Sequence, residues 1–194
     1  MANRRIDRAP GRRQSSRVTP SDLDRLRGGI RDVPDFPKPG IVFKDIVPLL
    51  SDPALFRLAI DGLVEAIGSR PVDKIVGIDA RGFIFGAAVA DRIGAGLIPV
   101  RKPGKLPWKT RSAAYTLEYG ESVVEIHEDA ISPGERVLLV DDLLATGGTS
   151  AAALKLTREL GAEIVGALFF IELTFLEGRA ALGDDVAVEA LIRF

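Results

Sequence analysis

The sequence has 194 residues, of which 46% are hydrophobic and 27% charged, and its formal net charge is −1. This length and composition are typical of one globular domain with a developed core, and no apolar run reaches the roughly 20 residues that span a bilayer. The chain has no cysteine and one histidine, His127, which excludes disulfides, thiolate metal sites, thiol nucleophiles and histidine metal clusters. We therefore expect a cytoplasmic protein that uses either no metal or Mg2+.

The first 17 residues are strongly basic. They contain six arginines and one acid, Asp7, so they carry +5, and the net charge of −1 leaves −6 for the rest. We expect residues 1–20 to form a disordered basic extension, because this segment has almost no apolar residues to bury. A weak polyanion-binding arm and an organellar targeting segment remain alternatives, whereas a secretory signal is excluded by the missing apolar core.

The next elements are two helices separated by a proline-rich connector. Thr19 and Pro20 provide a cap and a first turn for a helix that ends near Gly28 or Gly29. Residues 33–40 contain three prolines and a glycine, which predicts a structured, non-helical connector. Asp52 and Pro53 begin a second helix that runs to about Ser69. Its predicted apolar face consists of Leu55, Leu58, Ala59, Leu63 and Ile67.

From residue 74 onward, apolar strands alternate with helices. This alternation predicts an α/β fold with a parallel sheet that is covered on both faces. The predicted strands are 74–78, 97–101, 136–140 and 163–171, and the predicted helices are 82–93 and 149–160. Ligands of such sheets bind at the carboxyl ends of the strands, so the residues of interest follow Ile78, Val100, Val140 and Ile171.

One stretch interrupts the alternation. Residues 102–112 contain two prolines and four basic residues, and two strands, 113–119 and 122–126, follow. A basic loop carried on a hairpin within an α/β domain suggests a mobile lid. No internal repeat and no second domain is evident.

The strongest motif follows the strand 136–140. Two acids, Asp141 and Asp142, stand at its end, and a small glycine loop then leads into a helix. The loop amides and the helix N-terminus can bind a phosphate, and the acids can accept hydrogen bonds from the hydroxyls of a ribose. No lysine follows the glycines, which excludes the nucleotide P-loop. The loop residues are Ala145, Thr146, Gly147, Gly148 and Thr149.

This motif resembles the phosphoribosyl diphosphate (PRPP) signature of type I phosphoribosyltransferases, in particular the adenine branch. Residues 35–46, 79–83, 100–107 and 115–120 resemble further motifs of the family, in the same order. The resemblance implies the type I phosphoribosyltransferase fold over residues 21–194, with an N-terminal hood at about 30–48 and a lid at about 101–120. It also implies purine salvage, in which adenine and PRPP give AMP and pyrophosphate, by a homodimer that binds no nucleic acid or membrane.

The resemblance also implies roles for individual residues. Glu118 and Arg81 would be catalytic, with Glu118 assisting proton transfer at the purine. Val42 and Lys44 would bind the adenine edge through their main chains, while Phe43 and Leu173 enclose the ring. Pyrophosphate would be bound by a loop that often contains a non-proline cis peptide, together with basic lid residues; this set is Ala80, Arg81, Gly82, Arg101, Lys102 and Lys105. Mg2+ would be held mainly by PRPP, with a water bridge to Asp141 or Asp142 as an option.

Three alternatives remain open from the residues themselves. Enzymes that use hypoxanthine or guanine usually place a lysine after the strand beyond the phosphate loop; residues 169–174 contain none, which favours adenine. A PRPP-sensing regulator that binds nucleic acid would suit the basic tail, but no helix-turn-helix is visible and the lid and pyrophosphate loop look intact. Arg81 could be a surface arginine, although a cation at a helix N-terminus is unfavourable without an anion nearby. His127 is interpreted as an exposed strand residue rather than a catalyst.

Overall fold

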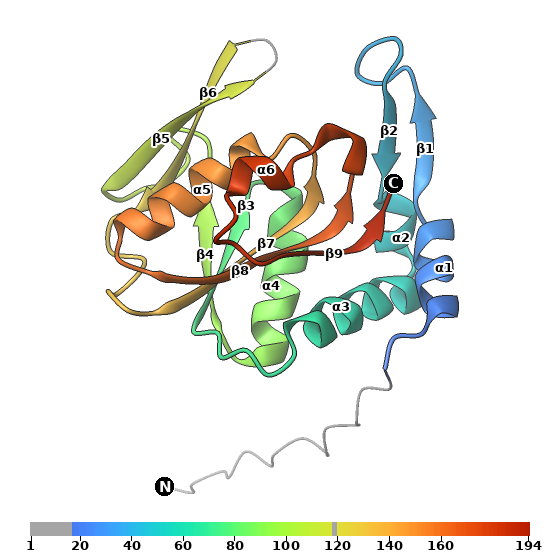
Figure 1. Ribbon diagram of the computed structural model, residues 1–194, viewed down its shortest axis with the longest axis horizontal. Helices are drawn as coiled ribbons and strands as arrows, with labels where there is room; N and C mark the ends of the chain where they lie inside the picture. Colours follow the sequence, from blue (N-terminus) through green and yellow to red (C-terminus); the bar gives the residue numbers. More distant parts are fainter. Residues whose placement is uncertain (1–16, 118–119) are drawn as a thin grey trace, which may run out of the picture.

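The computed structural model describes residues 17–117 and 120–194. Its central element is a parallel sheet of five strands in the order β4-β3-β7-β8-β9 (Figure 1). The predicted parallel α/β sheet is confirmed. The strands are β3 (Lys74–Ile78), β4 (Gly96–Val100), β7 (Arg136–Leu144), β8 (Glu163–Glu172) and β9 (Val188–Arg193).

Helices cover both faces of this sheet, as expected. One face packs against α3 (Pro53–Ile67) and α4 (Arg81–Ile93), and the other packs against α5 (Gly148–Glu159) (Figure 1). Alternate residues of β7 point to opposite faces, so Leu139 lies in one core cluster and Leu138 in the other. Burial on both faces explains why β7 and β8 are almost continuously apolar in sequence.

The N-terminal part adds a helix and a small hairpin. Helix α1 (Pro20–Gly28) has the predicted cap, and Thr19 and Asp22 bond reciprocally in a capping box. It leads to strands β1 (Arg31–Pro34) and β2 (Val42–Asp45), which pair in antiparallel register with Val33 opposite Phe43. The short helix α2 (Val47–Ser51) follows. The region 33–40 is non-helical as predicted, but the hairpin was not predicted, because its two strands have only four residues each and an irregular burial pattern.

The second hairpin stands on the α5 side of the sheet. It consists of β5 (Thr110–Leu117) and β6 (Gly120–His127), which confirms the predicted strand pair with slightly different ends. The chain then ends with a 3-10 turn (Thr174–Leu176), the short helix α6 (Arg179–Leu182) and β9. None of these three was predicted. Within the described ranges, no helix is long and apolar enough to cross a membrane.

Candidate functional site

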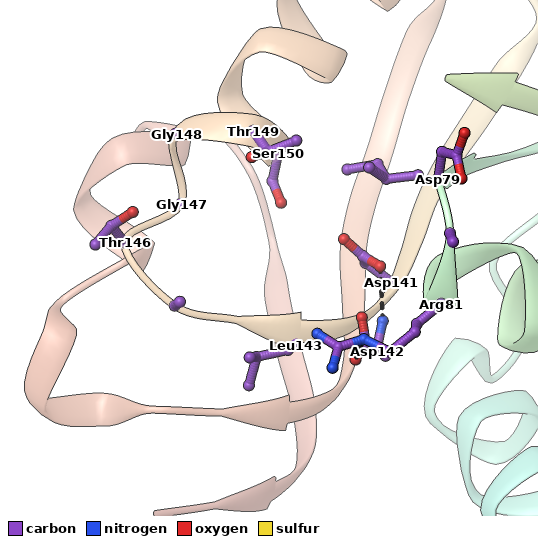
Figure 2. A pocket seen from close by; sticks show the side chains of 13 residues that line it. Asp79, Arg81, Asp141, Asp142, Leu143, Thr146, Gly147, Gly148, Thr149 and Ser150 are labelled. Carbon is purple, nitrogen blue, oxygen red and sulfur yellow. Dashed lines mark hydrogen bonds and ion pairs between the residues drawn. The ribbon is translucent and has the colours of Figure 1, made fainter. Parts of the chain in front are cut away.

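A cavity of about 210 Å3 lies where β3 and β7 end. Figure 2 shows the loop after β7 bending around this cavity, with the acids at one side and the start of α5 at the other. Two of the predicted strand ends therefore meet in one site. The lining residues are Ile78, Asp79, Ala80, Arg81, Asp141, Asp142, Leu143, Ala145, Thr146, Gly147, Gly148, Thr149 and Ser150.

The glycine loop is fixed by close backbone packing. Gly147 has φ of +81°, and a Cβ added there would lie 2.3 Å from the carbonyl oxygen of Gly178. A Cβ on Gly178 would in turn lie 2.1 Å from the carbonyl oxygen of Ala145. Both positions therefore require glycine, and the segment that starts at Gly178 supports the loop from behind. Gly178 was not identified from the sequence, because it lies 29 residues beyond Thr149, the last residue of the motif.

The loop presents free donors to the cavity. Within the part of the chain that the structure describes, no hydrogen bond is donated by the backbone amides of residues 146–149. These amides lead into the first turn of helix α5, whose N-terminus adds a partial positive charge. In Figure 2 the Thr149 and Ser150 side chains lie at the cavity, whereas the Thr146 side chain points outward. The arrangement suits an anion such as a phosphate group.

Two carboxylates face this donor-rich loop. Asp141 and Asp142 are only 9% and 5% exposed, and the Asp142 amide donates to Asp141 Oδ1 at 2.8 Å. Burial, together with the adjacent charge of Asp142, raises the pKa of Asp141 well above its usual range. Burial also raises the pKa of Asp142, but Arg81 opposes this shift. Two buried acids that lack full compensation require a polar ligand or a cation to be stable in their charged form.

Arg81 connects the acids with the N-terminal hairpin. Its Nε lies 2.8 Å from Asp142 Oδ2, and its guanidinium carbon lies 5.3 Å from the centre of the Phe43 ring. Arg81 begins α4, directly after a cis peptide bond between Asp79 and Ala80, as the resemblance implied. Arg81 is therefore paired with an acid at the site rather than being an isolated surface arginine.

Gly82 allows this geometry. A Cβ at residue 82 would lie 2.5 Å from Asp141 Oδ1, so any side chain would push α4 away from the tip of β7. The predicted loop residues Ala80, Arg81 and Gly82 are thus brought next to the predicted acids. Of these three, Ala80 and Arg81 line the cavity directly.

The basic residues after β4 lie outside the cavity. Arg101 Nε donates to Asp79 Oδ2 at 2.8 Å, and Arg101 Nη1 donates to the carbonyl of Lys105 at 3.1 Å. Lys102 and Lys105 are exposed, and neither forms an ion pair with a described residue. Arg101 thus reaches the site indirectly, through Asp79, and the two lysines do not line it in this conformation.

The residues predicted to bind the base are near the site but not in the cavity. Phe43 packs edge-on against Phe36, with ring centres 5.2 Å apart, as well as against Arg81. Val42 is 49% exposed, while Lys44 Nζ bonds to Asp32 at 2.6 Å and lies over the Phe194 ring. Leu173 follows β8, and its amide donates to the carbonyl of Leu144 at 2.9 Å.

Two further predictions have different outcomes. Glu118 lies outside the described residues, so its proposed role stays a prediction. His127 was expected to be exposed, and this is wrong: its Nε2 is buried without a hydrogen-bond partner among the described residues. It adjoins Lys74 and Gly96, at the opposite edge of the sheet from the acids, because the end of β6 packs against the starts of the strands. A catalytic role is therefore not supported.

Comparison with known proteins gives a consistent picture. The family model described as "Phosphoribosyl transferase domain" matches residues 49–183. The adenine phosphoribosyltransferase of Anaeromyxobacter dehalogenans is 56% identical over 172 residues, which cover 89% of this chain and 99% of the relative. The crystal structure of the adenine phosphoribosyltransferase from Thermoanaerobacter pseudethanolicus has a TM-score of 0.87 at 50% identity, covering 89% of this chain and 99% of its own. The Saccharomyces cerevisiae enzyme, solved with D-2,5-dideoxy-2,5-imino-altritol 1,6-bisphosphate and adenine, has a TM-score of 0.83 at 41% identity, covering 88% and 98%.

Proposed function

This chain belongs to the type I phosphoribosyltransferase family, in its adenine branch, and we propose that it converts adenine and PRPP to AMP and pyrophosphate in purine salvage. One observation carries the proposal: a glycine loop with free amides and two buried carboxylates share a single cavity. Donors on one side and acceptors on the other match the phosphate and the diol of a 5-phosphoribosyl group.

We assign the 5-phosphate of PRPP to the amides of residues 145–149. Because the loop is already held by Gly147 and Gly178, little ordering cost is paid when the phosphate binds. Thr149 and Ser150 hydroxyls at the cavity can add hydrogen bonds. Ser150 was not identified from the sequence, although it directly follows the motif.

We assign the ribose 2- and 3-hydroxyls to Asp141 and Asp142. Hydroxyl groups that donate to these buried carboxylates would stabilise their charged form. The same carboxylates would lie close to the ribose carbon that becomes positive as pyrophosphate departs, so they contribute electrostatic stabilisation of the transition state.

The diphosphate is assigned to the other half of the cavity. Ala80 and Arg81 line it, and Gly82 leaves room for the close approach. Arg101 is held beside Asp79, and Lys102 and Lys105 are close in sequence to it on an exposed loop. Closure of the lid, residues 101–120, would bring these cations to the leaving pyrophosphate and exclude water from the reacting sugar.

The base would lie between the hood, residues 30–48, and Leu173. In this proposal Val42 and Lys44 present main-chain groups to the adenine edge, and Phe43 contributes a ring face that Phe36 and Arg81 already orient. Glu118 remains the proposed group for proton transfer at the purine. The transferase domain is taken as residues 21–194.

Mg2+ is the proposed cofactor, and the residues fit a metal that PRPP carries into the site. The described residues contain no group of three or more His, Cys, Asp or Glu side chains that could hold a metal by themselves. Asp141 and Asp142 offer hard oxygen ligands beside the cavity, directly or through water, which suits Mg2+ bound largely by substrate oxygens. When bound, the ion would neutralise charge on the departing pyrophosphate.

The proposal also includes an oligomeric state and a cellular location. We propose a homodimer, as the resemblance to the family implies, in which the exposed lysines Lys102 and Lys105 could reach a partner's site as well as their own. We also propose a cytoplasmic location, where PRPP and free purines are available.

A substrate panel tests the function. Pyrophosphate release is measured with PRPP, Mg2+ and each of adenine, hypoxanthine, guanine and xanthine. We expect turnover with adenine and at least about 100-fold less with the 6-oxo purines, because their reversed edge leaves hydrogen-bonding groups unpaired. Turnover of hypoxanthine with adenine inert would contradict the assignment of the hood. Salt-sensitive DNA binding without any turnover would support a regulator instead.

A further inference from the structure

We propose that Glu172 and Arg179 are a positioning pair that holds the phosphate-binding loop, residues 145–149, in its working conformation from behind. This inference rests on the proposed function, because it assigns these two residues to the use of the 5-phosphate. Neither residue lines the cavity, so they would act through the backbone that they fix.

The pair is a two-point ion pair that is buried on one side. Arg179 Nε donates to Glu172 Oε1 at 2.6 Å, and its Nη2 donates to Oε2 at 2.8 Å. Glu172 is only 4% exposed, and Arg193 approaches its Oε2 at 3.2 Å. The remaining guanidinium nitrogen, Nη1, donates to the Val188 carbonyl oxygen at 2.6 Å. Such forked, charge-assisted contacts define direction as well as distance.

Arg179 is joined to the loop through its neighbour, Gly178. The Gly178 carbonyl lies against Gly147, and the Gly178 Cα lies against the Ala145 carbonyl, so closely that a Cβ at either glycine would clash. Leu182, one turn further on, is buried and packs near Gly147 as well. Any shift of the Arg179 segment would therefore be transmitted directly to the loop.

Glu172 is joined to the same loop from the other direction. It lies opposite Leu144 in the β7–β8 pairing, and the amide of the next residue, Leu173, donates to the Leu144 carbonyl at 2.9 Å. Leu144 directly precedes the loop. These contacts form a closed ring. Glu172 bonds to Arg179, Gly178 packs against Ala145, and Leu144 pairs with Glu172 again.

The ion pair is needed to fix the position of helix α6 against the loop. Helix α6 has four residues, too few to be stable through its own hydrogen bonds. Its position must be set by tertiary contacts, and the Arg179–Glu172 pair provides the directional one. The loop amides can then be aligned before the phosphate arrives, which is the condition for strong binding by backbone donors.

The test compares Arg179→Gln and Arg179→Lys with a matched control, Arg158→Gln. Arg158 also forms an ion pair with a residue before β9, Asp185, at 2.7 Å, but it contacts neither Glu172 nor Gly178. For the full-length enzyme with Mg2+ we would measure KM for PRPP, KM for adenine, kcat, the melting temperature, and dissociation constants for AMP and adenosine. Adenosine lacks the 5-phosphate, so the ratio of the two affinities isolates the contribution of the phosphate.

We expect Arg179→Gln to raise KM for PRPP at least about tenfold and to lower the AMP-to-adenosine affinity ratio by a similar factor, with KM for adenine changed less than about twofold. Arg179→Lys should recover part of the loss, because it keeps the charge but loses the fork; it also keeps the test valid if the glutamine variant does not fold. Arg158→Gln should match the wild type.

Two outcomes would overturn the inference. If both Arg179 variants only lower the melting temperature and leave KM for PRPP and the affinity ratio unchanged, the pair is structural and the inference is wrong, while the proposed function stands. If the wild type itself neither uses PRPP nor binds AMP, the proposed function fails and the inference fails with it.

Discussion

The loop after β7 and the loop after β4 leave the same edge of the same sheet, but they are built differently. Both contain a glycine with positive φ, Gly147 at +81° and Gly104 at +74°. Around Gly147 there is no space for a methyl group, whereas nothing lies within 4 Å of a Cβ placed on Gly104. The phosphate-binding loop is therefore held by close backbone packing, whereas around Gly104 the basic loop is held by a hydrogen bond from the Gly104 amide to Glu125 Oε2 at 3.1 Å rather than by packing. In the proposed function, the packed loop binds the 5-phosphate and the exposed loop closes over the pyrophosphate.

The largest effect is expected from replacing Gly147 by alanine. The new methyl would be 2.3 Å from the Gly178 oxygen, and alanine at this φ costs about 1–2 kcal/mol in addition. With overpacking of about 1–3 kcal/mol, the melting temperature should fall by roughly 4–20 °C, at about 2–4 °C per kcal/mol for a chain of this size, and PRPP use should be lost.

Gly104→Ala is the matched control for this change. It has a similar backbone angle but open surroundings, so it should lose only the cost of the angle, roughly 2–8 °C, and should keep measurable PRPP use. Scanning calorimetry and pyrophosphate release give both quantities. Equal effects of the two substitutions would contradict the contrast between the packed and the open loop.

Asp142→Asn should have the next largest effect. It removes a charged acceptor that we assign to a ribose hydroxyl, and such hydrogen bonds contribute about 1.5–3 kcal/mol, so kcat/KM for PRPP should fall roughly 10- to 150-fold. The fold should be retained, because asparagine has nearly the same volume; circular dichroism checks this. Normal activity in this variant would refute the ribose assignment.

A smaller effect is expected on the open side, from Lys102→Ala and Lys105→Ala. Each should lower kcat by about tenfold, the equivalent of about 1.4 kcal/mol of transition-state stabilisation. The melting temperature should hardly change, because both side chains are exposed and unpaired within the described residues. Lys155→Ala, on the far surface of α5, is the control. If kcat is unaffected in both variants, the basic loop does not act on the pyrophosphate.

The smallest effect is a gain in stability from Asp141→Asn. Burial and the adjacent charge of Asp142 raise the pKa of Asp141 in the folded protein, so the folded chain binds this proton more tightly than the unfolded chain, and the group lowers stability at neutral pH. The variant should therefore melt about 2–4 °C higher at neutral pH for each kcal/mol removed, although PRPP use falls. The gain should shrink as the pH drops through the raised pKa of the folded protein, and it should vanish near pH 4, where the unfolded chain is protonated too. A gain that is constant with pH would show that charge is not the cause.

Much of the fold could be predicted because the strands of the sheet and the helices that cover it show clear patterns in their own sequences. Strand β3 has the predicted bounds, and α3, α4 and α5 begin within two residues of their predicted starts. The β1–β2 hairpin, α6 and β9 were not predicted. They are short and partly exposed, and they are held by distant contacts, such as the pairing of β9 with β8, rather than by their own periodicity.

The site, too, contains residues that could be predicted from the sequence and residues that could not. The acids and the glycine loop form one continuous motif, and the structure brings that motif together with Ala80 and Arg81 in one cavity. Gly178, Arg179 and Glu172 could not be found from the sequence, since nothing in the neighbourhood of each shows what it contacts across the fold. Lys102 and Lys105 show the opposite limit: their residue types suggest a role, but both side chains are exposed and lie outside the cavity.

A crystal structure with AMP would show whether the amides of residues 145–149 bind the 5-phosphate of the substrate, as we propose. We expect phosphate oxygens about 2.7–3.2 Å from at least two of these amide nitrogens, with the ribose hydroxyls at Asp141 and Asp142. AMP bound at another place, with this loop in contact with nothing but solvent, would contradict the account.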